Sequence, residues 1–211
     1  GSRGLGDVYK RQEEPKATMP FQTLSRDTTF HLGAIAKSKR GQTYATLNLT
    51  TNAVFQLTGF NAPLHVPCVA GVYQEKGDET RINLDVVIDG ELLRIFDALD
   101  EQFEKMLAPH NQKSQYHPVV TKSEHGARLR IKVNTDGPKK ALMYNMKKER
   151  LGGIRNVETA GAYVVPVVAF TKAWWMTGQH GITMELRHCV IADPPGPDFD
   201  WPMDTSDETP F

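Results

Sequence analysis

Cysteine is scarce in this chain of 211 residues, in which Cys68 and Cys189 are the only two. Two cysteines are too few for a disulfide scaffold or a cysteine-rich zinc site, and such usage is typical of a reducing compartment. No apolar run approaches the roughly 20 residues that a membrane-spanning helix needs, and no secretory signal sequence is visible. We therefore expect an intracellular protein without a membrane partner.

Sequence motifs of the common enzyme classes are absent as well. The chain has no P-loop, no GxSxG nucleophile motif and no GxGxxG dinucleotide motif. Its seven histidines show neither HExxH nor zinc-finger spacing, and the neighbours His188 and Cys189 would face opposite sides of a strand. We expect no enzymatic activity, no cofactor and no metal site.

The net charge is zero, but this total hides two regions of opposite sign. Residues 193–211 hold six acids and no lysine or arginine, whereas the rest of the chain has 25 basic and 19 acidic side chains, a net charge of +6. A basic body with an acidic tail is typical of interaction tails, and a segment this polar cannot fold alone. We expect a disordered segment or one added for expression at 1–18, a nucleic-acid-binding domain at 19–192 and a disordered tail at 193–211.

Short runs of alternating apolar and polar residues predict strands on both sides of one helix. The expected strands are 43–49, 53–60, 65–73, 80–88, 127–133, 162–176 and 181–191. Apolar residues at helical spacing predict a helix over 91–107, and 137–153 is expected to be a short helix or a hairpin. Pro166 indicates that its strand is an edge strand or is bulged. The predicted fold is mainly β with one main helix, an OB-like β-barrel.

The most basic region, residues 113–155, holds eleven basic and three acidic side chains. Within it Arg128, Arg130 and Lys132 alternate with apolar residues and therefore share one face of a strand. Such a patch neutralises phosphates and supports salt-sensitive, sequence-independent binding of nucleic acid. A solvated basic face with core aromatics is the alternative, and charge alone does not separate the two interpretations.

Aromatic residues in and beside this region can stack on unpaired bases. Trp174 and Trp175 are neighbours, so a strand sends one inward and one outward, and the sequence does not decide which. A second basic cluster at 36–44 is expected to form a loop on another rim of the same groove. The residues expected to contact nucleic acid are Lys37, Lys39, Arg40, Tyr44, Tyr116, Lys122, Arg128, Arg130, Lys132, Lys139, Lys140, Tyr144, Lys147, Lys148, Arg150, Trp174 and Trp175.

The end of the tail resembles the C-terminal tip of bacterial and phage single-stranded DNA-binding proteins, in which acids precede a final aromatic residue. The residues that carry this resemblance are Asp204, Asp207, Glu208, Pro210 and Phe211. In that family a basic OB-fold body binds the strand, and a disordered acidic tail recruits replication and repair enzymes. Residues 43–191 also resemble single-stranded DNA-binding proteins of large DNA viruses that infect algae, in element order and in a final strand–Gly–strand unit that contains tryptophan.

These resemblances imply sequence-independent binding of single-stranded DNA in replication, recombination or repair, with partner proteins recruited by the tail. RNA is an alternative ligand, and a homo-oligomer is possible. The implied location is the nucleus or a viral replication compartment, or the cytoplasm of a bacterium. Three alternatives stay open: a virion or scaffold protein with a β-sandwich body and an acidic partner protein, an RNA-binding OB protein, and an enzyme whose site the sequence does not reveal.

Deleting residues 193–211 is expected to raise the affinity for single-stranded oligonucleotides, most clearly at low salt. Six tethered acids compete with phosphates for the basic groove at high effective concentration, and salt screens this competition. Phe211→Ala should leave the affinity nearly unchanged but abolish capture of a protein that binds the tip. Anisotropy titrations and pull-downs measure the two effects. A deletion that lowers the affinity or unfolds the body would show that the tail belongs to the fold.

Overall fold

The computed structural model describes residues 23–39, 41–48, 54–57, 63–68, 70–72, 80–110, 113–176 and 178–194. The expected N-terminal segment at 1–18 lies outside them. So do Arg40 and all of the tail after Pro194, including Asp204, Asp207, Glu208, Pro210 and Phe211. Within the described ranges, no helix is long and apolar enough to cross a membrane.

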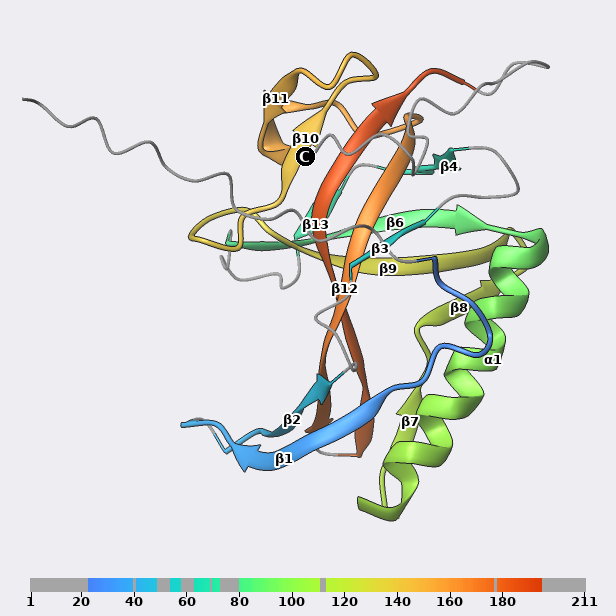
Figure 1. The fold of residues 1–211 in the computed structure, drawn as a ribbon, viewed down its shortest axis with the longest axis vertical. Helices are drawn as coiled ribbons and strands as arrows, with labels where there is room; N and C mark the ends of the chain where they lie inside the picture. The colour runs from blue at the N-terminus through green and yellow to red at the C-terminus, as the bar shows by residue number, and fades with distance from the viewer. Residues whose placement is uncertain are drawn as a thin grey trace, which may run out of the picture.

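The described strands form one curled sheet, and one long helix packs beside it (Figure 1). In chain order the elements are β1 (His31–Lys37), β2 (Thr43–Asn48), β3 (Phe55–Gln56), β4 (Leu64–His65), β5 (Gly71–Val72), β6 (Arg81–Ile88), α1 (Gly90–Leu107), the short 3-10 helix η1 (Ala108–His110), β7 (Gln115–His117), β8 (Val120–Ser123), β9 (Gly126–Asn134), β10 (Leu142–Tyr144), β11 (Arg150–Gly152), the 3-10 helix η2 (Ile154–Asn156), β12 (Tyr163–Met176) and β13 (Gln179–Ala192). The structure confirms the predicted fold class, mainly β with one main helix, in a sheet that curls into an OB-like half-barrel.

The sheet is built around the antiparallel hairpin of β12 and β13, two strands of 14 residues each. The main strand order is β1-β2-β12-β13-β9-β6-β5. β3 and β4 also pair with β12, and β7 and β10 also pair with β13. The two long strands therefore connect almost every part of the sheet, and they cross the whole molecule in Figure 1.

Pro166 lies in the middle of the sheet, so the edge-strand alternative was wrong for β12. It faces Cys189 of β13, and its carbonyl accepts a hydrogen bond of 2.9 Å from the Leu57 backbone N–H on the other side. The register with β13 shifts between Val167 and Val168, where Arg187 of β13 is the extra residue, so the bulge beside Pro166 lies in the partner strand. The bulge alternative holds for β12 further along the strand, between Phe170 and Lys172. Proline within a sheet is usually confined to edges and bulges because it cannot donate a hydrogen bond to the ladder, and Pro166 lies one residue from this register shift.

A second bulge reverses the side-chain alternation of β12. The register with β13 shifts between Phe170 and Lys172, and Thr171 is the extra residue of the bulge. As a result Phe170 and Ala173 both face the core, although an unbroken strand would send them to opposite sides. Lys172 is exposed on the other side.

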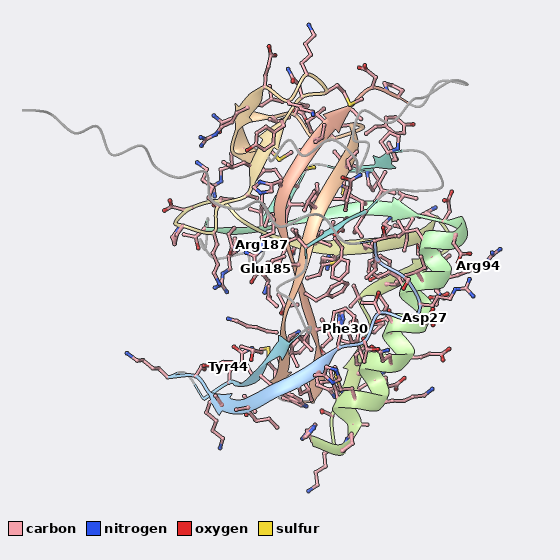
Figure 2. All side chains as sticks on the ribbon, viewed as in Figure 1. Asp27, Phe30, Tyr44, Arg94, Glu185 and Arg187 are labelled. Carbon is pink, nitrogen blue, oxygen red and sulfur yellow. The ribbon has the colours of Figure 1, made fainter. Side chains whose placement is uncertain are left out.

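The centre of the core is a cluster of aromatic rings around Phe170. Its ring centroid lies 5.0 Å from that of Phe30, 5.8 Å from Phe55, 6.3 Å from Phe96 and 5.7 Å from Phe103. Phe96 and Phe103 belong to the apolar stripe that predicted α1, and Figure 2 shows Phe30 between the helix and the long hairpin. The rings therefore fasten α1 to β12.

Two basic segments of the sequence lie in hairpins. The stretch 137–153 contains the antiparallel pair β10 and β11, which confirms the hairpin alternative. The cluster at 36–44, expected to be a loop, includes the end of β1 and the start of β2, joined by a tight turn. Gly41 has φ +80 in this turn, a conformation that side chains with a Cβ rarely adopt.

Replacing Phe170 by alanine is expected to lower the free energy of unfolding by about 3–5 kcal/mol, because it empties the centre of the aromatic cluster. Lys172→Ala, two residues away on the exposed side, is the matched control and should change stability by less than about 0.5 kcal/mol. Urea denaturation measures both. A loss of unfolding free energy below about 1 kcal/mol for Phe170→Ala would contradict this account of the core. If the alanine variant does not fold, Phe170→Leu is measured in its place.

Candidate nucleic-acid interface

The side of the sheet away from α1 gathers aromatic and basic side chains, and we call it the outer face. Figure 2 shows Tyr44, Glu185 and Arg187 on this side of the long hairpin. β2, β12, β13, β9 and β6 contribute to it because each turns alternate residues away from the core. Most of these residues are half-buried or exposed, but Gly181 and Glu185 of β13 are buried on this face. The outer face comprises Tyr44, Arg81, Asp85, Arg128, Arg130, Lys132, Lys172, Trp174, Gly181, Glu185 and Arg187.

An aromatic platform lies on the outer face where β2, β12 and β13 run side by side. Trp174 faces Tyr44 of β2 on one side and Gly181 of β13 on the other. A Cβ added at Gly181 would lie 2.9 Å from Cζ2 of Trp174, so the indole covers the bare backbone there. The His117 ring lies 6.3 Å from the Trp174 ring, and Lys172 Nζ lies 5.6 Å from the centre of the Tyr44 ring. Half-buried rings beside a cation are suited to stacking on bases.

Lys132 occupies a crowded electrostatic position next to this platform. Burial lowers the pKa of its ammonium group, and the nearby charges of Arg81 and Lys172 lower it further, whereas Glu185 raises it. Glu185 lies opposite Lys132 in the pairing of β13 with β9, and its carboxylate is 3.4 Å from the Arg187 guanidinium. A phosphate bound here would relieve the repulsion among the cations.

Arg128 and Arg130 lie further along β9, with side chains on the same outer face, as predicted. Arg130 forms two hydrogen bonds of 3.0 and 3.1 Å with the Asp85 carboxylate, and these bonds raise the pKa of its guanidinium. Arg128 has no ion pair among the described residues. Thr121, Ser123 and His125 complete a shallow groove around these side chains.

The cations of the β10–β11 region form a separate group, which we call the basic hairpin. Its cations are Lys139, Lys140, Lys147, Lys148 and Arg150, and Tyr144 lies among them. β10 runs parallel to β13 through the pair Tyr144 and Val190, at the opposite end of the long hairpin from Trp174 (Figure 1). Asn145 fixes its turn by accepting hydrogen bonds from the backbone N–H groups of Lys147 and Glu149, both 2.9 Å long. One patch predicted from sequence is therefore divided between two places.

Three residues predicted to contact nucleic acid are used elsewhere in the structure. Trp175 is 5% exposed and faces the core, so it is Trp174 that faces outward. The Tyr116 hydroxyl donates a 2.5 Å hydrogen bond to Asp100, and burial raises the pKa of Tyr116. Lys122 turns toward α1, where its Nζ lies 2.8 Å from Asp97. Trp175 and Tyr116 cannot serve as open stacking surfaces, and Lys122 is already paired.

Asp100 explains why Tyr116 is held in place. Its carboxylate accepts the Tyr116 bond together with backbone N–H bonds from Val119 (2.8 Å) and Val120 (3.1 Å). Burial raises the pKa of Asp100, and these bonds act in the opposite direction. The side chain thereby ties α1 to the segment that carries His117.

Lys37 and Lys39 are exposed near the turn between β1 and β2, and Lys37 pairs with Thr43, the neighbour of Tyr44. These two lysines therefore flank the aromatic platform. Four residues on or beside the outer face were not predicted from the sequence: Lys172, His117, Arg81 and Arg187. Lys172 is two residues from Trp174, so strand alternation would place both side chains on one face. Phe170 is two residues further back, however, and lies in the core, so alternation alone does not identify Lys172 as a surface residue.

No group of three or more histidine, cysteine, aspartate or glutamate side chains within the described ranges could hold a metal ion. The site instead offers rings, cations and hydroxyl groups. It can bind an anionic, partly aromatic ligand by stacking and by charge.

Comparison with known proteins finds no matching family model and no matching curated protein. Several solved structures have similar folds. The single-stranded DNA-binding protein of bacteriophage Enc34, in complex with single-stranded DNA, matches with a TM-score of 0.49 and 12% identity, covering 88% of this chain and 100% of that one. A single-stranded DNA-binding protein encoded by bacteriophage T7 matches with a TM-score of 0.48 and 11% identity, covering 69% of this chain and 89% of that one.

Gly181→Ala is expected to displace the Trp174 indole, since the new methyl group would lie 2.9 Å from both the ring and the His117 carbonyl oxygen. In a Trp175→Phe/Trp201→Phe background, Trp174 is the only tryptophan. With excitation selective for tryptophan, its fluorescence should shift to longer wavelength and become easier to quench with acrylamide. Gly153→Ala is the control, because its methyl group would come within 3.4 Å only of the flexible end of Lys140. Identical spectra for the two variants would contradict the described packing.

Proposed function

We propose that this protein binds single-stranded DNA through its outer face, with little dependence on sequence. The observation that carries the proposal is the aromatic platform of Trp174 and Tyr44, with Lys172 over the Tyr44 ring and Lys132 close to Lys172. Stacking requires unpaired bases, because the faces of paired bases are covered within a duplex. The combination of open rings and cations therefore favours a single strand over a duplex.

Binding involves no bond-making chemistry. Bases stack on Trp174 and Tyr44, while Lys172 and Lys132 neutralise neighbouring phosphates. Every base has an aromatic face, so stacking tolerates any sequence. The acids Asp85 and Glu185 hold Arg130 and Arg187 in place by ion pairs on the same face.

The basic hairpin extends this surface along the molecule. From Trp174 to Val165, which pairs with Val190 beside Tyr144, β12 covers about 30 Å at the usual rise per residue. A strand that runs along the long hairpin would reach both groups of cations. This length fits the roughly 4–16 nucleotides that single OB folds occupy.

The wider role that we propose is protection of single strands in replication, recombination or repair, inside a cell or a viral replication compartment. Partner proteins would bind the acidic tail through Asp204, Asp207, Glu208, Pro210 and Phe211. Single-stranded RNA is the second candidate ligand, since stacking and phosphate contacts are available to both nucleic acids.

Trp174→Ala is expected to weaken binding of an oligo-dT strand by about 1–3 kcal/mol, the usual contribution of one stacked base. Lys172→Ala should lower the slope of log affinity against log salt by roughly 0.7, the value for one phosphate contact with a single strand. Anisotropy titrations at several salt concentrations, repeated with oligo-rU and with a duplex, measure both effects and the choice of ligand.

Two matched variants control this experiment. Trp175→Phe changes the buried neighbour of Trp174, and Lys105→Ala removes an exposed lysine of α1. Both should leave affinity and salt slope unchanged in a folded protein. An affinity that does not depend on salt, or equal losses in the test and control variants, would contradict binding at the outer face.

A further inference from the structure

The groove between β6, β8 and β9 contains donors that the aromatic platform does not use. It is lined by Asp85, Thr121, Ser123, His125, Arg128 and Arg130. Thr121 and Arg128 lie directly opposite each other in the pairing of β8 with β9, and both side chains line the groove. A hydroxyl group and a guanidinium group thus meet at one place on the surface.

The charges in the groove are unequally compensated. Asp85 binds Arg130 through both carboxylate oxygens, so this pair contributes no net charge. Lys122 of the same strand β8 turns away to Asp97. Arg128 has no carboxylate partner among the described residues, and its positive charge is the uncompensated one beside Thr121.

Arg128 also has a donor that the fold leaves unused. Its Nε is buried, and no hydrogen-bond acceptor for it is found in the part of the chain that the structure describes. Buried donors without an acceptor are uncommon because they cost free energy, so such a group calls for an explanation. An arginine commonly binds a phosphate through two parallel N–H groups, and Nε can be one of them once the Arg128 side chain turns toward the groove and uncovers it.

Except for Thr121, the other residues that line the groove form bonds with one another or with nearby backbone. Ser123 Oγ donates to the Gly126 carbonyl and accepts a 3.2 Å bond from the His125 backbone N–H, which fixes the turn between β8 and β9. The Arg130–Asp85 pair forms the other wall. No hydrogen bond of the Thr121 hydroxyl is found among the described residues.

We infer that this groove is a phosphate-binding subsite in which Arg128 and Thr121 hold one phosphate group of the nucleic acid. The inference rests on the proposed function and adds a defined contact at the far side of the outer face. The phosphate can come from two sources, the backbone of a strand long enough to reach the groove or a phosphorylated strand end. A diester carries one negative charge, whereas a terminal monoester carries up to two and has three acceptor oxygens.

A length series with unphosphorylated oligo-dT tests the first source. For the unaltered protein, affinity should rise in a step once the strand reaches the groove, within roughly 4–16 nucleotides. Arg128→Gln should remove the step, lower long-strand affinity roughly tenfold, and reduce the salt slope by about 0.7. Short strands should bind this variant as well as the unaltered protein. Thr121→Val tests the hydroxyl without changing charge and should lower the step partially.

Short oligonucleotides with a 5′ or 3′ phosphate test the second source. If the terminal phosphate raises the affinity of the unaltered protein but not that of Arg128→Gln, the groove holds a strand end. Arg94→Gln is the control in both arms, because it removes an exposed arginine of α1 far from the outer face (Figure 2). It should behave like the unaltered protein throughout.

A titration with inorganic phosphate separates failure of this inference from failure of the proposed function. The side-chain Nε–H resonance of Arg128 in ¹⁵N-labelled protein should move as phosphate fills the groove, whether or not oligonucleotides bind. Loss of oligonucleotide binding with this shift intact would contradict only the proposed function. The inference of a phosphate-binding subsite would be wrong if oligonucleotides bind but the affinity shows no step with strand length, a terminal phosphate has no effect, and the Arg128 Nε–H resonance does not move.

Discussion

The bulge at Thr171 in β12 determines which side chains the core and the outer face receive. Before the bulge, Phe170 points into the aromatic cluster; after it, Lys172 and Trp174 point outward, although all three have the same parity in the sequence. Without the extra residue, either Phe170 would be exposed or Lys172 would be buried. Burying an unpaired ammonium group destabilises a protein, whereas burying an aromatic ring stabilises it, so the bulge makes a stable core and a basic surface compatible.

Some cations of the outer face form ion pairs with neighbouring acids, whereas Arg128 forms none among the described residues. Asp85 and Glu185 fix Arg130 and Arg187, and Glu185 lies beside Lys132. On a surface proposed to bind phosphates, acids reduce the total positive charge, but they also fix the conformation of long side chains, which lowers the entropy lost on binding. The affinity of this face for an anionic ligand should therefore depend more on a few side chains held in fixed positions than on the net charge of the protein.

Much of the fold could be predicted from the sequence because its signals are local. The alternation in β6 and β9 and the apolar stripe of α1 appear in the structure as expected, since no bulge interrupts those segments. The site was predicted less well. Trp175 packs in the core, and the reversal of alternation at Thr171 hides this from the sequence. Tyr116 is bonded to Asp100, and Lys122 is paired with Asp97. Both acids lie on α1, well separated from these residues in the sequence. Residue type alone does not reveal such pairings.

The central claim is that a single strand lies on the outer face across β2, β12 and β13. An amide chemical-shift map recorded with and without a short oligo-dT strand tests it most directly, because each strand of the sheet reports separately. The account predicts shifts centred on Tyr44, Lys172, Trp174 and Gly181, with Glu101 and Lys105 of α1 unchanged. Shifts confined to α1 or to the basic hairpin, with none around Trp174, would contradict it.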